Sequence, residues 1–172
     1  MKKIVLISII LIALLTTGCG VSSLGNFVLP DDIEFINTIK TLDTPQKVCE
    51  YIQNNFIPEA HLFYNLNPYE LYKTKKGDCY DTAIFAQFVA NFHGYTTYII
   101  VITFKDTSLK HALVVYEEEK GYTFSSWGSY FDYETLQDNF RDIVNLYYNY
   151  NKWSKYTVYG YDTNTIEEGY NN

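Results

Sequence analysis

One cysteine and one histidine of this sequence stand where nucleophilic chemistry is plausible. Cys79 follows Gly77 and Asp78, at the predicted start of an apolar helix. Unpaired amides and the dipole at a helix N-terminus stabilise a thiolate, the reactive form of cysteine, and can hold an oxyanion. His111 opens a predicted strand, where an imidazole could take the thiol proton and return it to a leaving group. The pattern indicates a Cys–His pair.

Both residues also have a plainer interpretation. A cysteine at a helix start is often inert, and Asp78 raises the thiol pKa unless its carboxylate turns away to cap the helix. A histidine at a strand end can lack any chemical role. The other two histidines are less suitable, because His61 lies in a predicted surface loop and His93 lies at the far end of the helix that Cys79 begins.

A third polar group is needed to orient the imidazole. In an antiparallel hairpin, the end of the strand after His111 returns to the level of that histidine, and this end carries Ser125, Ser126 and Trp127. Register cannot be read from the sequence, so either serine is a candidate. Both are hydroxyls, which stabilise an imidazolium less than a carboxylate does. Asp132 is a further candidate if the chain folds back.

The elements that would position these residues are helices first and strands second. Helical spacing and N-cap residues predict helices over 32–42 and 45–55, a short helix from 68, and a central helix from 78 to 94. Period-two patterns predict strands over 96–104, 111–117, 121–126 and 155–162, with a helix capped by Asp132 before the last. This order predicts an α+β fold with a central antiparallel sheet.

Composition narrows the class of protein. The chain has 172 residues, of which 47% are hydrophobic and 18% aromatic, so it can bury the core of one domain and is not low-complexity disorder. The formal net charge of −7 makes nucleic acid and anionic lipid poor partners. Most of the many tyrosines are expected to cover half-buried surfaces.

The N-terminus predicts export. Two lysines precede an apolar run over 4–15, which is too short to cross a bilayer comfortably, and the sequence then reads Thr-Thr-Gly-Cys. This segment resembles a bacterial lipoprotein signal, which implies residues 1–18 as signal peptide, a diacylated Cys19, a tether over 19–31 and a domain over 32–172. Ordinary secretion and an uncleaved anchor are alternatives. All three place the domain outside the cytoplasm, and both the lipid and an uncleaved anchor would hold it at a membrane.

Cys49 has a structural interpretation. It lies on the predicted helix beside Val48 and Ile52, where a small buried thiol is expected. A disulfide between Cys49 and Cys79 is the alternative in an oxidising compartment, and it would remove the nucleophile.

The motifs GDCYDTA, HALVV and GYTFSSW, within residues 72–127, resemble the transglutaminase-like superfamily of papain-type cysteine enzymes, in particular bacterial transglutaminase-like cysteine peptidases. The resemblance implies a papain- or transglutaminase-like core, with a Cys-bearing central helix packed on an antiparallel sheet. It implies Cys79 as nucleophile, His111 as base, and an aspartate where this sequence has Ser125 or Ser126. Some relatives use calcium. Asp78 and Asp81 are acidic neighbours of Cys79 here, but no ligand set is visible around them, and we predict neither a metal nor another cofactor.

Two functions follow from these observations. The first is an exported, membrane-anchored cysteine peptidase, amidase or acyltransferase acting on peptide or protein amides. The second is a catalytically decayed transglutaminase-like lipoprotein that binds a partner or serves a structural role. A serine in place of the aspartate favours the second.

Overall fold

The computed structural model describes residues 27–61, 64–132, 137–148 and 152–171. The predicted signal peptide, the lipidation of Cys19 and most of the tether fall outside these ranges. Within them, no helix has both the length and the apolar character needed to span a membrane.

Three N-terminal helices form where cap residues predict them. They are α2 (Ile33–Thr41), α3 (Pro45–Asn55) and α4 (Pro68–Thr74), and their N-caps are Asp32, Thr44 and Asn67. The cap side chains accept hydrogen bonds from amides of the first turn, which would otherwise lack partners. In α2 the buried side chains are Phe35 and Ile39, whereas Ile33 is exposed.

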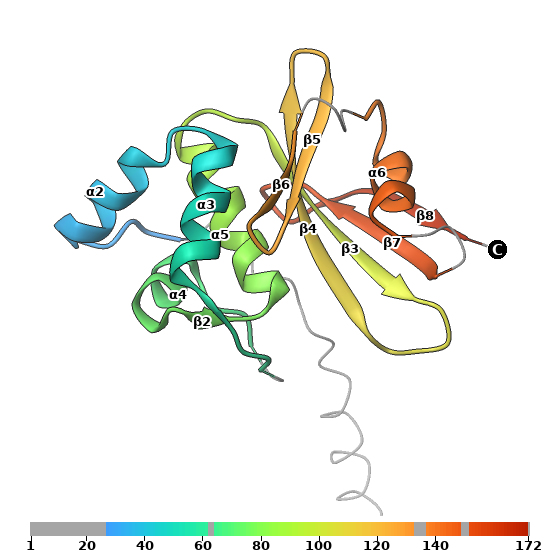
Figure 1. The fold of residues 1–172 in the computed structure, drawn as a ribbon, viewed down its shortest axis with the longest axis horizontal. Helices are drawn as coiled ribbons and strands as arrows, with labels where there is room; N and C mark the ends of the chain where they lie inside the picture. The colour runs from blue at the N-terminus through green and yellow to red at the C-terminus, as the bar shows by residue number, and fades with distance from the viewer. Residues whose placement is uncertain (1–26, 62–63, 133–136, 149–151, 172) are drawn as a thin grey trace, which may run out of the picture.

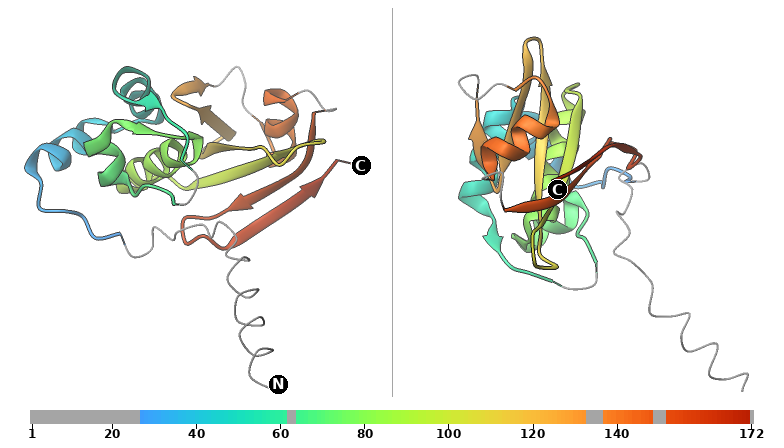
Figure 2. Two further views of the ribbon diagram at one scale, coloured as in Figure 1. Left: turned by 90° about the horizontal axis from the view of Figure 1, so that it is seen from below. Right: turned by 90° about the vertical axis from the view of Figure 1, so that its right-hand side faces the viewer.

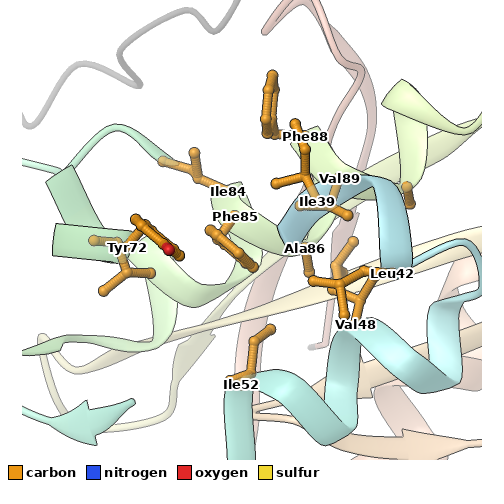
Figure 3. Packing of buried hydrophobic residues seen from close by; sticks show 14 of the residues in the cluster. Ile39, Leu42, Val48, Ile52, Tyr72, Ile84, Phe85, Ala86, Phe88 and Val89 are labelled. Atoms are coloured by element: carbon orange, nitrogen blue, oxygen red, sulfur yellow. The ribbon is translucent and has the colours of Figure 1, made fainter. Parts of the chain in front are cut away.

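The helix α5 (Cys79–Phe92) is the central element. Asp78 is its N-cap, as predicted, and it ends before Gly94, whose φ of 88° suits glycine. All ten residues from Asp81 to Ala90 are buried, so the helix is enclosed by other elements rather than lying on the surface. Figure 3 shows Phe85, Ala86 and Val89 of α5 facing side chains of α2 and α3. The buried helix provides a rigid support for Cys79.

A six-stranded antiparallel sheet follows α5, in the order β6-β5-β4-β3-β7-β8. Its strands are β3 (Thr97–Phe104), β4 (Lys110–Glu118), β5 (Gly121–Ser126), β6 (Ser129–Phe131), β7 (Trp153–Tyr159) and β8 (Thr165–Tyr170). A short parallel pair, β1 (Ile57–Pro58) and β2 (Lys76–Gly77), leads into α5. The sequence did not predict β1, β2, β6 or β8. Three of these are too short for a period-two pattern, and β8 is a largely exposed edge strand.

The last helix is shorter than predicted. α6 (Phe140–Tyr147) begins after Asn139, whose side chain accepts a hydrogen bond from the Asp142 amide. Asp132 is therefore not its cap. Gln137 instead pairs as an isolated bridge with Tyr122 of β5, which excludes it from a helix.

The sheet separates two hydrophobic cores. Figure 1 shows the N-terminal helices on one side of the sheet and α6 on the other. The N-terminal helices and α5 pack against one face, which includes Ile99, Ala112 and Val114. The opposite face, with Leu113 and Val115, packs against α6. Figure 2 shows the β7–β8 hairpin at one side of the molecule, with β8 as the outer strand. Because successive strand residues point to opposite faces, neighbouring residues of β4 and β5 belong to different cores.

A two-residue turn joins β5 to β6. Trp127 and Gly128 both have positive φ, 46° and 76°, as the tight hairpin turns that match strand twist require. Gly128 lies against α3, where an added Cβ would approach the Cys49 carbonyl oxygen to 2.7 Å. This contact fixes the end of β5, which carries both candidate serines.

Candidate active site

Cys79 occupies the first position of α5, and the cap beside it is reciprocal. The Asp78 carboxylate accepts hydrogen bonds from the amides of Tyr80 and Asp81, at 2.8 and 3.1 Å. The Asp81 carboxylate accepts one from the Asp78 amide at 2.8 Å. Asp78 is thus turned to the helix, and the amide of Cys79 is the first-turn N–H that this cap leaves for a ligand.

His61 lies in a loop, as predicted, but it is half-buried and paired rather than a free surface residue. Its Nε2 lies 2.5 Å from Oδ2 of Asp81, which is completely buried, and its Nδ1 lies 2.7 Å from the Tyr64 carbonyl oxygen. The other Asp81 oxygen accepts from the Leu66 amide at 2.8 Å. Burial disfavours the His61 imidazolium, but Asp81 outweighs it, so the pKa of His61 is raised. These bonds hold His61, Tyr64 and Leu66 against the start of α5.

Cys79 and His111 line the same pocket, a cavity of about 190 Å³. Its wall comes from α5, from β3, β4 and β7, and from the loop before α4. The lining residues are Asn65, Asp78, Cys79, Tyr80, Val101, Lys110, His111, Ala112 and Tyr159. The pocket brings together the two residues that the sequence singles out, and it adds Asn65, Lys110 and Tyr159, for which the sequence offered no signal.

The sulfur of Cys79 lies near the amide of Ala112 in β4. Burial raises the pKa of the Cys79 thiol, and the Asp78 carboxylate adds to this, while the Ala112 amide opposes it. Both Cys79 and Cys49 are free thiols, so the structure contains no disulfide between them. Cys49 is buried, as predicted, with its sulfur 3.8 Å from the Tyr116 hydroxyl.

The imidazole of His111 is held by hydroxyl groups on the face that α6 covers. Its Nε2 lies 2.8 Å from Oγ of Ser126, and this Oγ lies 2.7 Å from the hydroxyl of Tyr147. The Tyr147 ring is parallel to the imidazole, with centroids 5.7 Å apart, and the Tyr148 ring meets it edge-on. Burial lowers the pKa of His111, so the ring is neutral near pH 7.

The structure distinguishes the candidates for the third group. Ser126 contacts His111, whereas Ser125 points to the opposite face and lies 3.0 Å from the Tyr116 hydroxyl. Asp132 lines a different hollow with Thr44, because β6 runs away from the turn that adjoins Ser126.

No hydrogen bond joins Cys79 to His111 among the described residues. The sulfur lies on the α5 side of the sheet, and Nε2 of the imidazole faces Ser126 on the α6 side. Cys79 and His111 both line the pocket at the beginning of β4, and this pocket is what connects them. A raised thiol pKa and a lowered imidazole pKa together mean that the resting pair is a neutral thiol and a neutral imidazole. The sequence suggested a thiolate, but burial could not be read from it.

One group of possible metal ligands lies beside the pocket. The ligand atoms of His61, Asp78 and Asp81 are all within 4.8 Å of one another. Calcium takes six to eight oxygen ligands. Here one of the three groups is an imidazole, and both carboxylates already accept hydrogen bonds from amides. This donor set does not fit calcium, and no catalytic step is assigned to a metal.

Comparisons with known proteins found solved structures that are similar to part of this chain. Among solved structures, calcium-bound LapG of Legionella pneumophila is 16% identical, with a TM-score of 0.46 over 61% of this chain and 66% of that chain. A second structure of Legionella pneumophila LapG is 18% identical, with a TM-score of 0.48 over 59% of this chain and 66% of that chain. The chain thus spans slightly less than two thirds of these relatives. A search of curated proteins gave no match.

The family model for the transglutaminase-like domain matches residues 32–130. This match covers more than half of the chain and includes α2 to α5, β3 to β5 and the pocket residues Cys79 and His111. On this evidence the chain belongs to the transglutaminase-like domain family.

Proposed function

We propose that this protein is a cysteine hydrolase that cleaves peptide bonds, with Cys79 as nucleophile and His111 as general base. One observation carries the proposal. The free thiol of Cys79, at the start of a buried helix, shares an open pocket with the imidazole of His111, which the Ser126 hydroxyl holds in place. Family membership agrees with this chemistry.

The reaction begins from the neutral pair. His111 uses Nδ1, because Nε2 contacts Ser126. Nδ1 takes the proton of the Cys79 thiol when substrate fills the pocket, since hydrogen bonds between catalytic groups commonly tighten only in the substrate complex. The sulfur bonds to the carbonyl carbon, and the imidazolium protonates the departing amine as the C–N bond breaks. Water then releases the acyl group by the reverse proton transfers. Hydrolysis is favoured over transfer because water is the default acceptor.

The oxyanion has two candidate donors. The Asp78 carboxylate takes the amides of Tyr80 and Asp81, which leaves the Cys79 amide for the developing charge. The side chain of Asn65, in the same pocket, is the second donor that we assign. Loss of one such donor typically costs about 10²–10³ in kcat.

The site of action is part of the proposal. We propose that the domain works outside the cytoplasm, tethered to a membrane by lipid on Cys19, because the N-terminal segment has the basic, apolar and Cys-containing parts of a lipoprotein signal. Metabolic labelling with a palmitate analogue tests this: the label should enter the wild-type chain and be lost in Cys19→Ala. Equal labelling of the two would refute it.

A randomised peptide library tests the chemistry. Wild type should give cleaved peptides by mass spectrometry, Cys79→Ala none, and Cys49→Ala, which removes the other described thiol, should cleave like wild type. Quenched reactions should show an acyl adduct on Cys79. Cleavage by Cys79→Ala would refute the proposal.

A second candidate function rests on a specific observation. The group that orients His111 is a hydroxyl rather than a carboxylate, and burial raises the pKa of Cys79. Both features favour a non-catalytic module that binds a peptide in the same pocket. Library peptides retained by the wild-type chain but never cleaved would support it.

A further inference from the structure

The Ser126 hydroxyl has one proton and two neighbours that could accept it. Ser126 is 4% exposed, and its described partners are Nε2 of His111 and the hydroxyl of Tyr147. A hydroxyl donates one hydrogen bond and accepts up to two. If Ser126 donates to Tyr147, Nε2 must carry the imidazole proton; if Ser126 donates to Nε2, the proton must sit on Nδ1.

We propose that Tyr147 is a positioning residue that sets the tautomer of His111 through Ser126. The phenol oxygen accepts the Ser126 proton, so Oγ presents lone pairs to Nε2–H. Nδ1 is then the bare nitrogen available to the Cys79 thiol. This inference rests on the proposed function for its catalytic consequence, but the tautomer itself does not depend on catalysis.

The geometry couples Tyr147 to the imidazole of His111 in two ways. The bonds from Nε2 to Oγ and from Oγ to the phenol oxygen, 2.8 and 2.7 Å, form a continuous chain in which aligned hydrogen bonds strengthen one another. The parallel Tyr147 ring also fixes the plane of the imidazole. Tyr147 lies on α6, beyond residues 32–130 that the family model matches, so the family match assigns it no role.

The proposal predicts an unusual pattern of mutants. In Tyr147→Phe the ring stack remains, but buried Ser126 can donate only to Nε2 among its described partners, which moves the imidazole proton to Nδ1. Nitrogen NMR of the full-length chain with ¹⁵N-labelled histidine should show the His111 ring proton on Nε2 in wild type and on Nδ1 in Tyr147→Phe. Tyr98→Phe is the matched control, because it removes a hydroxyl bonded to Glu117 on the same sheet face, and it should leave the tautomer unchanged.

Kinetics supply the second measurement. Tyr147→Phe should lower kcat about 10²-fold with little change in KM, since a general base contributes about 10²–10⁴. Adding Ser126→Ala to Tyr147→Phe should restore part of this loss, because it removes the donor that holds the wrong tautomer.

Two results would overturn the proposal: Nδ1–H in the wild type, or the same tautomer in wild type and in folded Tyr147→Phe. The wild-type spectrum decides the first even if the variant fails to fold. Failure of the proposed function is seen separately, as peptide cleavage that persists in Cys79→Ala.

Discussion

Replacing Asp81 by asparagine tests whether the start of α5 is held as the structure describes. The two carboxylate oxygens accept from the Leu66 amide, the Asp78 amide and His61. Asparagine has one oxygen, so its NH₂ group must face at least one of these amides. A buried N–H without an acceptor costs about 1–3 kcal/mol, and the lost charge on the pair with His61 adds to this.

The expected loss for Asp81→Asn is about 2–4 kcal/mol, or a fall in Tm of about 5–15 °C for a domain of this size. Thermal unfolding of the full-length chain, followed by circular dichroism, measures it. Asp43→Asn is the control, because it breaks an exposed ion pair with Lys47 and should leave Tm unchanged.

The loss of stability in Asp81→Asn should also depend on pH. Asp81 raises the pKa of His61 in the folded state, so their pairing stabilises the fold fully below the unfolded pKa of about 6.5 and is lost as pH rises through the higher folded value. The gap in stability between wild type and Asp81→Asn should be wider at pH 5.5 than at pH 8.5. A gap that is absent, or wider at pH 8.5, would refute the reasoning.

Two further predictions concern the turn and the metal. Gly128→Ala should destabilise the fold by about 2–4 kcal/mol, because residue 128 has a positive φ and the added Cβ would meet the Cys49 carbonyl. Gly94→Ala is the control and should cost about 1–2 kcal/mol, because residue 94 has a positive φ but open space around it. Equal losses of stability in urea unfolding would contradict the packing argument. Calcium or EGTA should leave Tm unchanged, since the donors beside Cys79 do not fit the ion; a calcium-dependent rise would show that the cap rearranges to bind it.

Much of the fold could be predicted because its signals are local. Asp78 followed by an apolar helix that ends at a glycine defines α5, and the β-branched run after it defines β3. The strand β6 could not be predicted because three residues are too few for a period-two pattern. The late start of α6 could not be predicted because it depends on pairing with a strand that is distant in sequence. Gln137, for example, bonds to Tyr122 instead of joining a helix.

The candidate site could be predicted only in part. Cys79 and His111 are found from their positions at the starts of a helix and a strand. The choice of Ser126 over Ser125 depends on register, which the turn at Trp127 and its packing on α3 decide. Neither the contact of His61 with α5 nor that of Tyr147 with Ser126 has a local signal, since each joins segments distant in sequence.

The central claim is that His111 acts on the Cys79 thiol, and alkylation measures this most directly. The rate of iodoacetamide addition to Cys79 should be followed by mass spectrometry at pH 7 in wild type, His111→Ala and the control His93→Ala, whose imidazole instead contacts the Ile39 carbonyl. We predict that Cys79 reacts faster than buried Cys49 in wild type. His111→Ala should slow the alkylation of Cys79 at least about tenfold, whereas His93→Ala should leave its rate unchanged. Equal rates for Cys79 with and without the His111 imidazole would contradict the account.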